Sequence, residues 1–117
     1  MTELGRHEDE RGVIQDLLGP VDAVTEIFTR KGAVRGNHVH ERTTQYTYIA
    51  WGALLVATQP DVTHTQEYGP GQLIVEAPGI PHAWKALADT KVLVFTIGPR
   101  SGAAYESDTQ RLKEPLL

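Results

Sequence analysis

Residues 32–40 read GAVRGNHVH, and this stretch decides the fold. It separates His38 and His40 by a single residue, and Gln45 and Gly52 follow a short distance later. In a β-strand, residues i and i+2 point to the same face, so both imidazoles can reach one point. Two rings on one face could bind a cation or act as a pair of proton carriers.

A third histidine, His82, follows about forty residues later in a Pro-Gly-Ile-Pro-His segment. The same parity places Gln45 and Thr47 on one face of their strand. It also places His82 and Trp84 on one face of another strand. If these faces turn inward, they enclose a pocket with a polar focus and an apolar wall that includes Trp84 and Ile49.

The apolar residues repeat mainly with a period of two or in short runs bounded by Gly and Pro, which is typical of strands. We predict strands at 21–30, 33–40, 44–50, 53–59, 72–77, 82–88 and 91–97. A weaker pattern allows helix at 13–18 and in the tail. Short strands at this spacing predict a single all-β domain over residues 1–117, either a sandwich or a barrel. The tail from Ser101 is expected to pack as an arm against the body or a partner subunit.

Composition restricts the classes of function. The chain has no cysteine, which excludes disulfides and thiolate ligands. It shows neither a signal peptide nor an apolar run long enough for a membrane span, so we expect a cytoplasmic protein. A net charge of −4 argues against nonspecific nucleic-acid binding. Basic residues flank the histidine pair and suit a small anionic ligand, with solvated charges on turns as the alternative: Arg30, Lys31, Arg35 and Arg42.

These segments resemble the two sequence motifs of the cupin family. The first motif has a glutamate between its histidines and its last glycine, and the matching residues are Gly32, His38, His40, Gln45 and Gly52. The second motif is matched by Gly71, Gly79 and His82, with Ala77 and Ala86 where the family has proline and asparagine. The resemblance implies a cupin double-stranded β-helix, a jelly-roll-like barrel that commonly forms homodimers.

In cupins, the motif histidines and glutamate usually hold a divalent metal ion. Carried over, the implied ligands are His38, His40, Gln45 and His82. An amide oxygen carries no charge, so we expect imidazole-preferring Zn, Fe, Ni or Cu rather than Mg or Ca. The first hypothesis is therefore a metal-binding cupin that acts on a small molecule, as a dioxygenase or an isomerase does.

A narrower resemblance connects three short elements to the isomerase and epimerase cupins that act on sugar nucleotides. These elements are Asp-Glu-Arg-Gly at 9–12, Arg-Gly-Asn-His at 35–38 and Tyr-x-x-Asp-x-x-Arg at 105–111. The resemblance implies a metal-free site in which His38 removes a proton beside a ketone and Arg35 meets the diphosphate. His40 would then be the second proton carrier. A neutral imidazole suits such proton transfer near neutral pH.

A third hypothesis is a non-catalytic cupin that binds a small ligand or a metal as a sensor. Under each hypothesis, we expect Arg35, Thr47 and Trp84 to contact the small molecule. The catalytic residues are expected to be His38 and His40. The sequence leaves open the identity of the metal, the reaction and which tyrosine, if any, acts as an acid.

Overall fold

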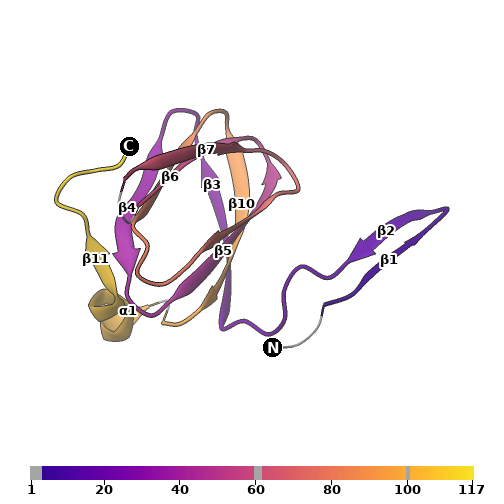
Figure 1. Cartoon of the computed structure of the whole chain (residues 1–117), viewed down its shortest axis with the longest axis horizontal. Helices are drawn as coiled ribbons and strands as arrows, with labels where there is room; N and C mark the ends of the chain where they lie inside the picture. The colour runs from indigo at the N-terminus through magenta and orange to yellow at the C-terminus, as the bar shows by residue number, and fades with distance from the viewer. Residues whose placement is uncertain (1–3, 60–61, 100) are drawn as a thin grey trace.

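The computed structural model describes residues 4–59, 62–99 and 101–117, which form a β-barrel with a projecting hairpin (Figure 1). In chain order, the elements of these residues are β1 (Arg6–Asp9), β2 (Gly12–Gln15), β3 (Ala23–Thr29), β4 (Val34–His40), β5 (Thr44–Trp51), β6 (Leu54–Thr58), β7 (His64–Tyr68), β8 (Leu73–Glu76), β9 (His82–Ala86), β10 (Thr90–Ile97), α1 (Gly102–Asp108) and β11 (Thr109–Arg111). The predicted all-β class and the jelly-roll-like barrel are confirmed.

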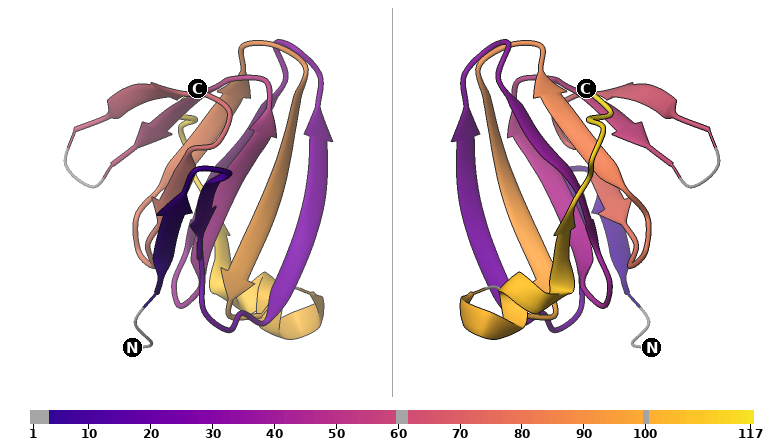
Figure 2. Two further views of the ribbon diagram at one scale, coloured as in Figure 1. Left: turned by 90° about the vertical axis from the view of Figure 1, so that its right-hand side faces the viewer. Right: turned by 90° about the vertical axis from the view of Figure 1, so that its left-hand side faces the viewer.

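Two antiparallel sheets enclose the core (Figure 2). One has the strand order β3-β10-β5-β8 and the other β11-β4-β9-β6-β7. Burial alternates along β10 from Thr90 to Thr96, as expected for strands with one face toward the core. The apolar core includes Ile49, Leu54 and Val92, each 0% exposed. The period-two pattern of the sequence therefore reflects the inner faces of these two sheets.

All seven predicted strands are present, but the sequence pattern missed β1, β2, β7 and β11. The helix considered at 13–18 is wrong, because residues 12–15 form strand β2 and pair with β1. Both strands of this hairpin are almost wholly exposed, so no buried face imposed a periodic pattern on them. The tail does contain a helix, α1. Within the described part of the chain, no helix is long and apolar enough to cross a membrane.

The tail packs on the barrel of its own chain. Strand β11 pairs with β4, and the backbone N–H of Leu112 donates to the carbonyl of Asn37 at 2.9 Å. The backbone N–H of Leu116 donates to Asn37 Oδ1 at 2.7 Å. The tail therefore lies beside the strand that carries His38 and His40.

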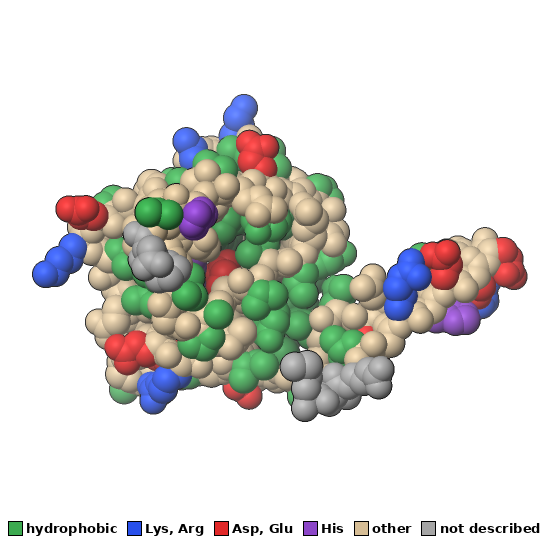
Figure 3. All heavy atoms as spheres, in the orientation of Figure 1, with side chains coloured by type: hydrophobic (Ala, Val, Ile, Leu, Met, Phe, Trp, Pro, Cys, Tyr) green, Lys and Arg blue, Asp and Glu red, His purple; other side chains and the backbone are tan. Residues whose placement is uncertain are grey.

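The outer face of the β3-β10-β5-β8 sheet exposes large apolar side chains. Val24 and Val75 are both 59% exposed, and Trp51 is 45% exposed. Figure 3 shows hydrophobic side chains gathered on the part of the barrel nearest the hairpin. The hairpin forms a separate two-stranded sheet in which Ile14 is 68% exposed. An isolated hairpin is marginally stable in water, so both features favour cover by another surface.

The motif glycine Gly52 stands where backbone conformation and space both require glycine. Its φ is +98°, and an added Cβ would lie 2.6 Å from the carbonyl oxygen of Asp89. Gly71 has a similar φ of +81°, but nothing lies within 4 Å of its added Cβ. An alanine at position 71 would therefore meet only backbone strain, whereas an alanine at position 52 would meet backbone strain and steric overlap.

We predict that Gly71→Ala lowers the free energy of unfolding by about 1–2 kcal/mol, the cost of a left-handed conformation for an L-residue. Gly52→Ala should lower it by about 2–5 kcal/mol, because overlap with backbone atoms adds to the same strain. Denaturant unfolding of both variants measures the difference. Equal costs at the two positions would contradict this account of Gly52.

Candidate functional site

A β-bulge in β4 turns Arg35 and His38 to the same side of the sheet. Along β4 and β9, Arg35 is opposite Trp84 and His38 is opposite His82, while the register skips Asn37. Asn37 has a φ of +56°. Without the bulge, residues three apart would point to opposite faces. The bulge therefore brings a guanidinium group and an imidazole to one inner face.

The three motif histidines converge as the sequence predicted. The possible ligand atoms of His38, His40 and His82 all lie within 4.8 Å of one another. His38 Nε2 lies 3.0 Å from His82 Nε2. His82 is 1% exposed and His40 is 5% exposed. These imidazoles therefore form a compact, largely buried cluster that can hold a metal ion.

Groups behind the cluster orient two of its rings. His82 Nδ1 lies 3.3 Å from the carbonyl oxygen of Ile80, which can only accept, so this nitrogen is the donor. His40 Nδ1 lies 3.2 Å from Thr109 Oγ1 and 3.8 Å from Asp108 Oδ2. Their Nε2 atoms are then the ones that can serve as ligands. Such outer contacts fix the tautomer and direction of metal-binding histidines.

Asp108 is a fully buried carboxylate in the Tyr-x-x-Asp-x-x-Arg element. Its Oδ2 accepts from Thr43 Oγ1 at 2.6 Å, and its Oδ1 accepts from the Arg42 backbone N–H at 2.7 Å. Burial by itself raises the pKa of Asp108, but these hydrogen bonds outweigh burial and leave the pKa below its usual value. Asp108 is therefore an ionised group behind His40.

A second buried carboxylate, Glu76, was missed by the sequence analysis. It is 3% exposed, and its Oε2 lies 3.0 Å from His82 Nε2. Despite that proximity, this oxygen has no hydrogen-bond partner in acceptable geometry among the described residues. Strand parity was the available signal, because Glu76 shares the inward face of β8 with the core residue Ile74.

The Glu76 carboxylate also affects the protonation of its neighbour. Burial by itself lowers the pKa of His82, whereas direct contact with the Glu76 carboxylate, the negative charge of that carboxylate and the Ile80 carbonyl raise it. The balance leaves the pKa of His82 above its ordinary value. The environment of His82 therefore favours positive charge at this position.

A pocket of about 500 Å³ opens over the cluster. Its lining combines basic, aromatic and imidazole side chains, among them Arg35, His38, His40, Gln45, Trp84, Tyr105 and Arg111. The structure thus places Arg35 and Trp84 on the pocket wall. Thr47 is 0% exposed and does not line the pocket. Its hydroxyl lies below the surface, between the side chains of Gln45 and Glu76.

Arg35 is held at the pocket by residues of β3, in the opposite sheet. Its Nε donates to Thr29 Oγ1 at 2.9 Å, and its Nη2 donates to the Phe28 carbonyl at 3.2 Å. A second guanidinium comes from Arg111, which is opposite His38 across the β11–β4 pair. The wall of the pocket therefore offers two cationic groups to an anion.

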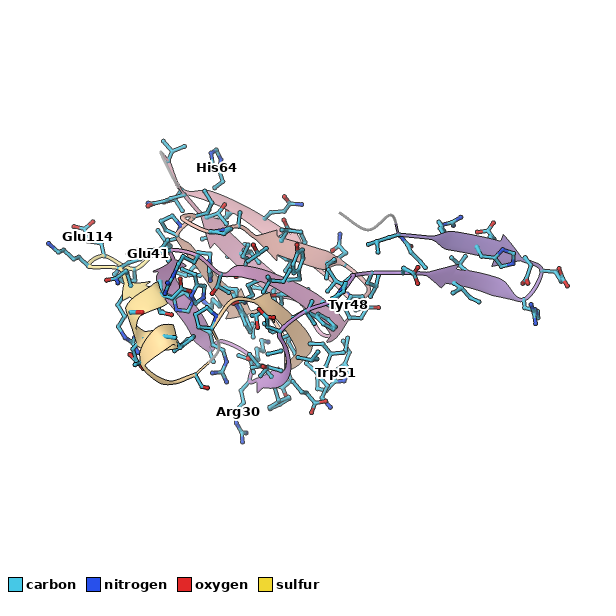
Figure 4. All side chains as sticks on the ribbon, turned by 90° about the horizontal axis from the view of Figure 1, so that it is seen from below. Arg30, Glu41, Tyr48, Trp51, His64 and Glu114 are labelled. Atoms are coloured by element: carbon cyan, nitrogen blue, oxygen red, sulfur yellow. The ribbon has the colours of Figure 1, made fainter. Side chains whose placement is uncertain are left out.

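The other basic residues near the motif do not line the pocket: Arg30, Lys31 and Arg42. Arg30 projects away from the barrel (Figure 4). Tyr48 lies on the outer side of β5, because Thr47 and Ile49 on either side of it in the strand face the core. Tyr105 is the tyrosine that lines the pocket, and its ring centroid is 6.1 Å from that of His40. The structure therefore selects one tyrosine from the four in the sequence.

The chain belongs to the cupin family, whose family model matches residues 19–113. This match covers the barrel strands and both histidine motifs, and it confirms the resemblance drawn from the sequence. No curated protein matches the sequence significantly.

Solved structures with the same fold include proteins that act on sugar nucleotides. QdtA, a sugar 3,4-ketoisomerase from Thermoanaerobacterium thermosaccharolyticum crystallised with TDP, has a TM-score of 0.75 and 18% identity over 94% of this chain and 85% of QdtA. The dTDP-4-dehydrorhamnose 3,5-epimerase of Sulfolobus tokodaii has a TM-score of 0.67 and 18% identity over 91% of this chain and 72% of the epimerase.

A third similar structure belongs to a longer protein. The capsular polysaccharide assembling protein CapF from Staphylococcus aureus has a TM-score of 0.70 and 17% identity over 97% of this chain. The match covers 35% of CapF, so the chain spans about a third of that protein's length. At such identities, these likenesses establish a shared fold, and the function depends on the site.

Proposed function

We propose that this cupin is an enzyme that holds a divalent transition-metal ion on His38, His40 and His82 and acts on a small anionic molecule. The observation that carries the proposal is the convergence of the three imidazoles beneath a pocket with two guanidinium groups. The metal classes expected from imidazole donors are Zn, Fe, Ni and Cu.

The residues present fit such an ion. Three imidazoles from two strands, β4 and β9, meet the ligand count of many catalytic centres, which leave a position open for substrate. The contacts of His40 with Asp108 and of His82 with Ile80 orient the donor nitrogens. A bound divalent ion would supply Lewis-acid polarisation of a substrate carbonyl oxygen.

The substrate class we propose is a nucleotide-linked keto sugar. Arg35 and Arg111 supply guanidinium groups suited to the oxygens of a diphosphate. Trp84 gives the wall an apolar surface for the sugar or the base. Two similar structures are named for keto-sugar isomerisation or epimerisation, which supports this class of ligand. Tyr105 lines the same pocket, with its ring centroid 6.1 Å from that of His40, and we assign it the role of proton carrier in such a reaction.

We expect the untagged protein to retain about one divalent ion per chain, as measured by elemental analysis. His82→Ala should lose this ion, because it removes a buried ligand that lies 3.0 Å from His38 Nε2. Replacing His64, an exposed histidine outside the cluster, should leave the metal content unchanged. A His82→Ala protein with full metal content would disprove the ligand set.

Nucleoside diphosphates should raise the melting temperature, because a ligand that binds the folded state stabilises it. Arg35→Ala should reduce this shift, since its guanidinium lines the pocket. Arg30→Ala is the matched control, because that side chain projects away from the pocket. Equal shifts in both variants would exclude Arg35 as the diphosphate contact. Binding without any turnover of keto-sugar nucleotides would favour the non-catalytic alternative.

A second candidate function is the same proton chemistry without a metal ion. The observation that favours it is the 3.0 Å separation of His38 Nε2 and His82 Nε2, which also suits a proton held between two imidazoles. Under this hypothesis, His38 is the base and Arg35 holds the diphosphate. Metal-free protein that exchanges the substrate's α-proton with solvent, and loses that exchange in His38→Asn, would favour it.

We also propose that the chain forms a homodimer through the outer face of the β3-β10-β5-β8 sheet. The exposed side chains of Val24, Val75 and Trp51 would be covered by the second copy. The β1–β2 hairpin, which forms a sheet separate from the barrel, would gain a surface to pack against. A second copy is therefore the partner that would cover both features.

Light scattering should give a dimer mass for the wild type and a monomer mass for Val24→Asp. A charge at this position would have to be desolvated in the interface. Val62→Asp is the control, because Val62 is 61% exposed but lies outside the sheet. A dimer that survives Val24→Asp would place the interface elsewhere, and a monomeric wild type would refute the proposal.

A further inference from the structure

We propose that Glu76 is the carboxylate ligand of the metal centre, in place of the motif glutamate that this sequence replaces with Gln45. The inference rests on the proposed metal-binding function, and it names a ligand at a position that neither histidine motif specifies. It predicts a donor set of three imidazoles and one carboxylate: His38, His40, His82 and Glu76.

The sheet brings Glu76 to the cluster from the strand next to the motif position. Strand β8 pairs with β5, and Glu76 lies directly opposite Gln45. Two side chains in such a pair share a face of the sheet, so both point into the barrel. Glu76 extends far enough to place Oε2 3.0 Å from His82 Nε2. Glu76 on β8 and Gln45 on β5 therefore both face the histidine cluster, and Glu76 contacts it.

The atoms that meet there repel each other when His82 is neutral, and a proton on Nε2 or a metal ion can join them. His82 Nδ1 is the donor to the Ile80 carbonyl, so the neutral ring turns the lone pair of Nε2 toward Glu76. Glu76 Oε2 is buried and lacks a hydrogen-bond partner among the residues described. A buried carboxylate oxygen without a partner is costly. A metal ion shared by these atoms would satisfy both lone pairs.

The contacts of Gln45 fit a supporting role. Its side-chain amide donates to Thr47 Oγ1 at 3.2 Å, and the Thr47 hydroxyl donates to Glu76 Oε1 at 3.4 Å. Gln45 therefore acts on Glu76 through Thr47. A glutamate at position 45 would place two like charges directly opposite each other, which is unfavourable. A neutral amide at position 45 is thus the natural counterpart of an acid at position 76.

The test compares metal affinity in variants of the two opposed positions. Metal-free protein is titrated with Zn²⁺ or Ni²⁺ in a calorimeter at slightly alkaline pH, where imidazoles are neutral. Glu76→Gln keeps the size of the side chain and removes its charge. We expect it to weaken binding by roughly ten- to a hundredfold or more, whereas Gln45→Ala should change affinity by less than about threefold. His82→Ala should bind no metal.

A Glu76→Gln protein with wild-type affinity, or a greater loss in Gln45→Ala, would overturn the inference and leave metal binding intact. Absence of metal binding in the wild type would refute the proposed function as well. Circular dichroism and thermal melting check that each variant folds. If Glu76→Gln does not fold, Glu76→Asp takes its place, because it keeps the charge but draws the oxygens back. Its affinity should then fall below that of the wild type, and unchanged affinity would count against the inference.

Discussion

The site depends on one cross-strand pair, His38 on β4 and His82 on β9. Their Nε2 atoms lie 3.0 Å apart, although the two residues are far apart in the sequence. The bulge at Asn37 preserves this pair and also turns Arg35 inward, opposite Trp84. The bulge in β4 therefore positions both the histidine cluster and the arginine on the pocket wall. A strand of regular register would give only one of them.

Two buried carboxylates flank the imidazole cluster on opposite ends. Asp108 lies behind His40, held by donors from Thr43 and Arg42, while Glu76 reaches His82. Burial of two acids is expensive unless positive charge accompanies them. Asp108 already has the Arg42 guanidinium 3.4 Å from its Oδ1. A divalent ion bound by the imidazoles would balance the charge of Glu76, so this acid gives the same indication as the imidazoles, from a residue that the first histidine motif does not contain.

Much of the fold could be predicted from sequence, because strands with one buried face repeat with period two. The histidine cluster was also predictable, since motif spacing and parity determine which rings face inward. The exposed hairpin gave no such signal, and its second strand was confused with a helix. The orientation of Arg35 was not predictable, because a bulge changes parity without altering composition. Parity along β8 places Glu76 on the inward face, but the histidine motifs assign no ligand to that position.

The location of the carboxylate has a consequence for how this barrel would admit a substrate. Neighbouring strands lie about 4.8 Å apart. A carboxylate on β8 therefore lies about that distance to the side of a carboxylate at the motif position on β5. Gln45 then keeps a neutral, hydrogen-bonding side chain on the pocket surface, while Glu76 lies beneath it, 3% exposed. The pocket entrance thereby loses an exposed anion close to Arg35 and Arg111. An anionic ligand would therefore approach two guanidinium groups without meeting a carboxylate at position 45, and the charge required to hold a cation would remain below the surface.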